Sequence, residues 1–240
     1  MKASIKTGSE LQDHIFDTYI SLRYGIAFLA LAFPFVVPLA GWFHGDSLRG
    51  SLSEYFCEGG GTGDMSGVFA ARTGFVGILF AVGSALYLYK GFSSLENYLL
   101  NVAGIGALLV ALIPTPCRDA GYTLTILGLT LHGLTAHGIA ATALFICVAL
   151  VCLLCSGGTL HLVPSPTARA WYERAYKVLA ILMVVLPLFA VLLSVASGPG
   201  GKPILAVEAA GTLVFGAYWL LKSIELSHSG ALRKAAQGAV

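Results

Sequence analysis

The chain has 240 residues, of which 57% are apolar and only 11% carry a formal charge. Soluble domains have about 25% charged residues, so the composition excludes an ordinary soluble globular domain and indicates a surface that faces lipid. The net charge of +2 at pH 7 is small, and it gives no electrostatic reason to expect a nucleic-acid partner.

The first twenty residues are polar, so we expect no cleaved signal peptide here. Ser9 and Gln12 form a capping-box pattern, which is typical of a helix N-terminus. Apolar side chains then follow at helical spacing: Leu11, Ile15, Tyr19 and Leu22. The pattern predicts a short helix lying on the membrane surface, within a cytoplasmic segment over residues 1–22. A disordered tail is the alternative.

Six later segments are long and apolar enough to span a membrane, which takes roughly 20 residues of helix. An apolar barrel strand would alternate with polar residues, so we predict six α-helices. They are Tyr24–Phe43, Val68–Tyr89, Leu95–Ile113, Leu127–Leu153, Lys177–Ser197 and Ile204–Leu221. The predicted protein is an all-α polytopic membrane protein, with a six-helix transmembrane domain over residues 23–222 and a cytoplasmic tail over residues 223–240.

Positive charges divide unequally between the two sides of this topology. Ten of the 14 Lys and Arg residues fall at the two ends of the chain and in the loops after the second and fourth segments. The other side has four: Arg49, Arg72, Arg118 and Lys202. Because cytoplasmic loops are enriched in Lys and Arg, both termini are predicted to be cytoplasmic, in a bacterial cytoplasmic (inner) membrane.

The cysteines fall into two groups on this map. Cys57 and Cys117 lie in the two outer loops that precede the second segment and follow the third, in a compartment that can be oxidising. A Cys57–Cys117 disulfide is predicted, with two unconnected thiols as the alternative. The other three cysteines, in the inner half of the fourth segment, are predicted to be small packing residues: Cys147, Cys152 and Cys155.

Ionisable residues gather in the outer half of three predicted spans, where such side chains usually face the bundle interior or a cavity. Arg72 and Glu208 are expected to pair across the bundle. The alternatives are that Arg72 snorkels to the outer headgroups or pairs with Asp64. His132 and His137 are five residues apart, about 140° around a helix, so they are not a helical zinc pair. Hydrogen-bonded packing is the alternative to a binding role.

The outer loop over residues 44–65 is rich in acids and glycines. Its titratable residues other than Arg49 and Cys57 include His44, Asp46, Glu54, Glu58 and Asp64. Carboxylates in a flexible loop suit a lid or a cation site. A solvated linker is the alternative.

Four stretches follow one another along the chain: SLSEYF, RTGFVGILFAVGSALYLYKG, NVAGIGALLVALIPT and EAAGTLVFGAYWLLKS. In this order they resemble a family of bacterial multi-helix membrane proteins with no established activity, over roughly residues 20–225. The matching residues are Ser51, Ser53, Tyr55, Arg72, Pro114, Thr115, Glu208, Trp219 and Lys222. Cys57 stands where that family has a histidine, and Thr73 where it has an aspartate. These departures weigh against a metal or acid–base role for the motif.

A weaker likeness, in fold alone, is to the superfamily of alkaline ceramidases and progestin-type receptors. Its hydrolase members carry a serine, an aspartate and three histidines at a zinc site. The corresponding residue types here differ in spacing: Ser53, Asp64, His132 and His137.

These observations predict an outward-facing polar pocket that binds a lipid headgroup, a small molecule or an ion. The candidate binding residues are Arg72, Glu208, His132, His137, Tyr55, Ser53 and Asp64. One alternative is a scaffold subunit of a larger membrane complex, and a further one is a membrane-embedded lipid hydrolase, although no nucleophile and base have a diagnostic spacing. The bilayer is the expected partner, beside a lipid or small-molecule ligand and a membrane-protein partner or second copy. The sequence identifies no cofactor and no metal.

Overall fold

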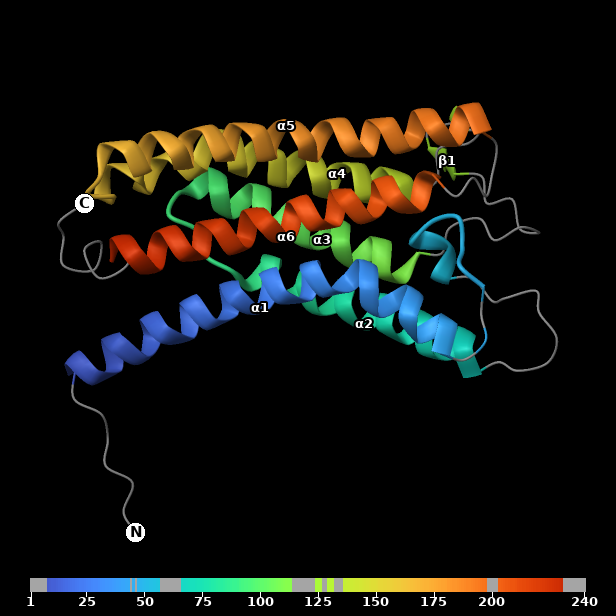
Figure 1. Cartoon of the computed structure of the whole chain (residues 1–240), viewed down its shortest axis with the longest axis horizontal. Helices are drawn as coiled ribbons and strands as arrows, with labels where there is room; N and C mark the ends of the chain where they lie inside the picture. Colours follow the sequence, from blue (N-terminus) through green and yellow to red (C-terminus); the bar gives the residue numbers. More distant parts are fainter. Residues whose placement is uncertain are drawn as a thin grey trace, which may run out of the picture.

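The computed structural model of the chain describes residues 8–43, 45, 47–56, 66–113, 124–126, 129–131, 136–197 and 203–230. Six long helices run side by side in alternating directions (Figure 1). They are α1 (Gly8–Phe43), α2 (Ser66–Leu88), α3 (Ser94–Leu112), α4 (Ala136–Leu150), α5 (Pro166–Ser197) and α6 (Pro203–Ser229). Six helical stretches of the described chain are long and apolar enough to cross a membrane, which confirms the predicted all-α polytopic fold.

The helix predicted near the N-terminus is the beginning of the first span and not a separate element. α1 is one helix of 36 residues, and no break marks the predicted boundary at residue 22. No glycine or proline, the residues that most disfavour a helix interior, lies between Gly8 and Gly25. α1 begins at the same end of the bundle at which α6 ends (Figure 1).

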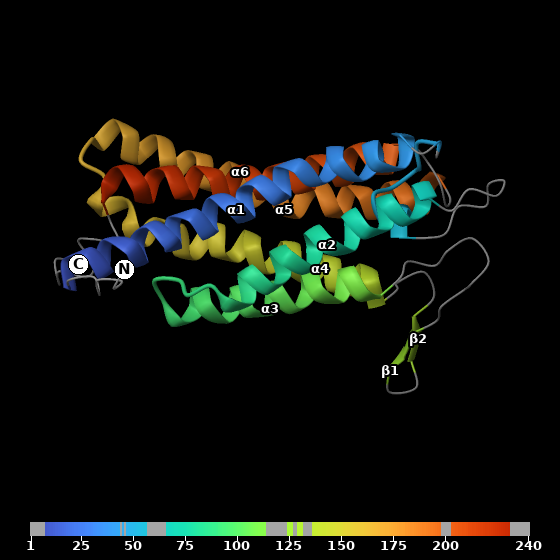
Figure 2. The same cartoon turned by 90° about the horizontal axis from the view of Figure 1, so that it is seen from below.

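The predicted start of the fourth span at Leu127 is wrong. Two short antiparallel strands, β1 (Leu124–Ile126) and β2 (Leu129–Leu131), occupy the described residues before α4, which begins only at Ala136. Figure 2 shows this hairpin to the side of the helices. Leucine and isoleucine alternate with threonine in this stretch, a period-two pattern of strands that average hydropathy does not register. Beyond α4 the helix first widens into η2 (Val151–Cys155), a π-helical turn, and then narrows into η3 (Ser156–Leu162), a 3-10 helix.

The helices form a closed ring in chain order. Each helix packs against the next, and α6 closes the ring by packing against α1. Glycines permit a close crossing between α2 and α3. A Cβ atom at Gly104 would lie 2.7 Å from the carbonyl oxygen of Gly83, so only glycine lets the two backbones approach this closely.

Residues Arg49–Phe56 fold into a compact turn at the end of the bundle where α1 ends and α6 begins, and we call this turn the plug. It contains η1 (Ser53–Phe56), whose Tyr55 and Phe56 are buried. The turn is held by its own polar groups: the Glu54 carboxylate accepts the Gly50 N–H at 2.9 Å, and Arg49 donates to the Glu54 carbonyl at 2.6 Å. The solvated-linker interpretation is therefore wrong for this part of the loop.

Candidate functional site

Ser53 of the plug contacts His137 in the first turn of α4. Ser53 Oγ lies 3.1 Å from His137 Nε2, and His137 Nδ1 lies 2.8 Å from the carbonyl oxygen of Ile113. A carbonyl oxygen only accepts, so Nδ1 carries the ring proton, and Nε2 of the neutral imidazole accepts the Ser53 hydroxyl proton. His137 is buried, and its ring stacks on that of Phe75 with 6.5 Å between centroids. The tautomer and orientation of the imidazole are therefore fixed.

The partner of His137 Nδ1 follows from where α3 ends. Ile113 is the C-cap of that helix, with an extended backbone. The last carbonyls of a helix have no partner within it, so the Ile113 oxygen needs a donor from elsewhere. His137 supplies that donor and ties the end of α3 to the start of α4.

Glu208 lies in the second turn of α6 and holds the plug from another side. Its Oε2 accepts the Leu52 N–H at 2.6 Å, and the backbone of Ser53 also bonds to this carboxylate. One turn earlier, Leu205 donates its N–H to the Gly50 carbonyl at 2.7 Å. The start of α6 therefore sets the position of the turn that carries Ser53.

The predicted ion pair between Arg72 and Glu208 is not formed. The guanidinium carbon of Arg72 lies 4.5 Å from the centroid of the Phe56 ring, a cation–π contact. Backbone N–H groups of the plug satisfy the Glu208 carboxylate instead. Both residues therefore contact the plug, Arg72 from α2 and Glu208 from α6, but they do not contact each other.

A cavity of about 200 Å³ lies beneath the plug. All six helices and the plug contribute to its lining, and most of its walls are aliphatic or aromatic. The polar side chains that line it are Ser53, His137, Thr142, Glu208 and Thr212. Three of the predicted binding residues, from the plug, α4 and α6, thus meet at one apolar cavity.

Tyr55 and Arg72, two further predicted binding residues, are not among the residues that line this cavity. Tyr55 is 1% exposed, and its hydroxyl accepts the Arg49 N–H at 3.3 Å. The Arg49 guanidinium carbon lies 5.4 Å from the centroid of the same ring. Tyr55 is thus part of the interior of the plug, and Arg72 packs on the plug through Phe56.

The remaining predicted residues lie outside the part of the chain that the structure describes. These are His132 and Asp64, together with Cys57 and Cys117 and the disulfide predicted between them. The three cysteines of the fourth segment are free thiols: Cys147, Cys152 and Cys155. Within the described ranges, no three His, Cys, Asp or Glu residues are grouped so that they could hold a metal ion.

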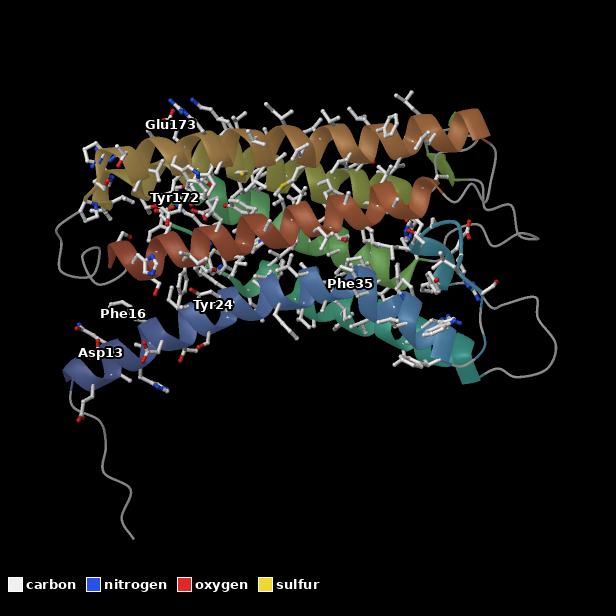
Figure 3. The ribbon with its side chains drawn as sticks, viewed as in Figure 1. Asp13, Phe16, Tyr24, Phe35, Tyr172 and Glu173 are labelled. Carbon is white, nitrogen blue, oxygen red and sulfur yellow. The ribbon has the colours of Figure 1, made fainter. Side chains whose placement is uncertain are left out.

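Larger hollows on the bundle surface are open grooves that do not reach this site. One of about 590 Å³ runs between α5 and α6 and is lined by apolar side chains together with Arg174, as expected for a lipid-facing surface. Another, of about 340 Å³, lies beside η2 and η3 and has charged residues on its rim, among them Glu173 and Lys177. Glu173 is on the outer side of α5 (Figure 3).

Sequence reasoning missed a buried polar network at the opposite end of the bundle from the plug. Lys222 Nζ lies 2.7 Å from Glu225 Oε2, and the two side chains are 3% and 0% exposed. Glu225 also accepts the hydroxyl protons of Tyr176 at 2.5 Å and Thr159 at 2.6 Å. Lys222 donates further to the Ser156 carbonyl at 2.8 Å. The i, i+3 spacing of Lys222 and Glu225 was the one signal in the sequence.

Arg23 of α1 belongs to the same end and is 1% exposed. Its Nη1 donates to the Tyr89 hydroxyl, and its guanidinium carbon lies 4.7 Å from the ring centroid of Trp219. Its Nε and Nη2 have no hydrogen-bond partner among the described residues. Burial raises the pKa of Tyr89, with the Arg23 charge opposing the shift, so Tyr89 is a neutral phenol at physiological pH. Arg23 thereby fastens α1 to the end of α2 and to α6.

Comparison with known proteins identifies no relative of this chain. No protein-family model matches the chain, and neither a curated protein nor a solved structure matches it. Inferences about function therefore rest on the geometry of the chain itself.

Proposed function

We propose that this integral membrane protein binds an uncharged amphiphile, such as a lipid with a hydroxyl or ester group, in the cavity beneath the plug. The observation that carries the proposal is the lining: apolar walls from six helices, with Ser53, His137 and Glu208 together at the plug. The volume of about 200 Å³ is below the ~300–1,000 Å³ of common small-molecule sites. It suits one end of a single chain better than a whole two-chain lipid.

The charges around the cavity favour an uncharged ligand. Among the described residues that line it, Glu208 is the only carboxylate, and no Lys or Arg is present. The nearby cation of Arg72 lies against Phe56. An anionic headgroup would therefore meet a carboxylate without a facing positive charge, whereas a hydroxyl or ester can bond to Ser53 and His137.

Native mass spectrometry of the gently solubilised protein tests this proposal. We expect wild-type protein to retain one amphiphile per chain. The Ala141→Phe variant should lose it, because Ala141 lines the cavity and a benzyl group would fill much of the space. Ile146→Phe is the matched control, since Ile146 lies on the same helix and is 44% exposed.

Equal retention of the amphiphile by both variants would contradict binding in this cavity. A co-purifying membrane protein without any amphiphile would favour the scaffold alternative instead.

The proposal places the plug on the outer side of a bacterial cytoplasmic membrane, with the start of α1 and the end of α6 in the cytoplasm. Ten of the 14 Lys and Arg residues support this orientation. In a chain whose five cysteines are replaced by alanine, Ser47→Cys should react with a membrane-impermeant thiol reagent on intact cells. Thr167→Cys should react only after permeabilisation, because both positions are exposed but lie at opposite ends. The reverse labelling pattern would show that the protein has the opposite orientation in the membrane.

A further inference from the structure

We propose that Ser53 and His137 form a nucleophile–base pair that transfers the acyl group of an ester bound in the cavity. The inference rests on the proposed function, because it needs an amphiphile with its polar group at the plug. It adds an activity to that binding site and names the ligand class as carboxylic esters of lipid type.

The geometry has the three parts that such a pair needs: a hydroxyl, a base within hydrogen-bond reach, and a group that orients the base. Ser53 Oγ lies 3.1 Å from His137 Nε2. The Ile113 carbonyl, 2.8 Å from Nδ1, takes the orienting place that a carboxylate has in many hydrolases. Because Nδ1 must donate to that carbonyl, Nε2 has its lone pair directed at the Ser53 hydroxyl.

Both members of the pair also reach the proposed ligand. Ser53 and His137 line the cavity, and Ser53 is only half-buried, so an ester can approach its oxygen. Glu208 bonds to the backbone of Leu52, whereas the two ring nitrogens of His137 bond to Ser53 and Ile113. Glu208 is therefore a positioning residue for the Ser53 turn.

The chemistry follows in two balanced steps with water as the co-reactant. Ser53 Oγ forms a bond to the ester carbonyl carbon and its proton moves to His137 Nε2. The carbon–oxygen bond to the alcohol then breaks, and that alcohol leaves with the proton. Water next gives a proton to Nε2 and attacks the acyl–Ser53 ester. The carboxylic acid leaves, and Ser53 recovers its proton. The sum is ester plus water to acid plus alcohol.

An alkyl fluorophosphonate with one long chain tests the pair on the whole protein in mixed lipid–detergent micelles. The probe forms a phosphorus–oxygen bond with a base-activated serine and releases fluoride. We expect one adduct, on Ser53 in peptide mass spectra. His137→Gln should slow its formation on the order of 100-fold, the usual contribution of a general base. Ser47→Ala, which removes an exposed serine of the same segment, should label as wild type does.

A negative result with the wild-type protein is enough to refute the inference, since only a serine activated by a base is expected to form the adduct readily. Absence of the Ser53 adduct in folded wild-type protein overturns it, and so does equal labelling of a folded His137→Gln variant. If native mass spectrometry still finds the amphiphile in that case, only the pair is refuted and the binding function stands. If the amphiphile is absent as well, the binding function falls with it.

Discussion

Lys222→Met should lower the free energy of unfolding by about 3–5 kcal/mol, the usual effect of removing one partner of a buried ion pair. The substitution leaves the Glu225 carboxylate, whose side chain is 0% exposed, without its cation at 2.7 Å. Methionine keeps the length of the side chain, so the loss reports the charge and its bonds rather than a cavity. Reversible unfolding in mixed micelles measures it.

The pair of Lys177 and Glu173 on α5 is the matched control. Its N···O distance is also 2.7 Å, but the two side chains are 61% and 56% exposed. Water and salt screen such a pair, so Lys177→Met should cost far less than Lys222→Met. Similar losses in both variants would show that burial at this end of the bundle does not decide the energetics.

The double variant Lys222→Met/Glu225→Met separates the ion pair from its surroundings. Removing both charges should recover part of the loss, because an apolar replacement of a buried pair is often nearly neutral. Recovery should be incomplete, since the hydroxyls of Tyr176 and Thr159 then lose the carboxylate that accepts from them.

The sequence predicted the number and nature of the spans because hydrophobic length is a property of each segment by itself. The start of the fourth span could be found only from the two-residue periodicity of β-strands, which hydrophobic length does not measure. In each strand one threonine lies between two aliphatic residues, a pattern that favours strands, yet the stretch as a whole is as apolar as a spanning helix. The predicted boundary between the N-terminal helix and the first span does not exist, because no residue near position 22 ends a helix and α1 continues through it.

The sequence suggested His137 and Glu208 because depth in the membrane can be counted along a helix, and it suggested Ser53 through the resemblance of the loop motif. Ser53, His137 and Glu208 do meet at one cavity. The hydrogen-bond partners of these side chains depend on how each helix is rotated about its axis and on nearby backbone groups. Neither can be predicted from amino-acid composition. Glu208 therefore bonds to Leu52 N–H and not to Arg72, and His137 bonds to a carbonyl of α3.

The buried polar network at the opposite end of the bundle also could not be predicted from the positions of its charged residues. Arg23 and Lys222 fall near the ends of their spans, where charged side chains usually reach water, and they entered the topology count as such. The structure has both almost wholly buried. Aromatic rings around Arg23 and the Glu225 carboxylate beside Lys222 replace water. The rings around Arg23 belong to Tyr89, which follows α2, and to Trp219 of α6, and local sequence does not reveal these contacts. For Lys222 the spacing to Glu225 on the same helix is the one local signal.

Glu208→Ala should loosen the plug, whereas Glu208→Gln should leave it in place. The alanine variant removes the acceptor of the Leu52 N–H, which lies 2.6 Å from Oε2, and a buried N–H without an acceptor costs about 1–3 kcal/mol. Glutamine retains an oxygen that can accept the same bond. Hydrogen exchange should therefore be faster at the Leu52 amide in the alanine variant and close to wild type in the glutamine variant.

The same two variants distinguish positioning by Glu208 from a requirement for its charge. If Glu208 acts by holding the Ser53 turn, fluorophosphonate labelling of Ser53 should be lost in Glu208→Ala and kept in Glu208→Gln, in step with Leu52 exchange. A glutamine variant with normal exchange but no labelling would show that the negative charge itself is needed at the cavity. Unchanged exchange in the alanine variant would show that Leu205, whose N–H bonds to the Gly50 carbonyl at 2.7 Å, is enough to hold the plug on α6.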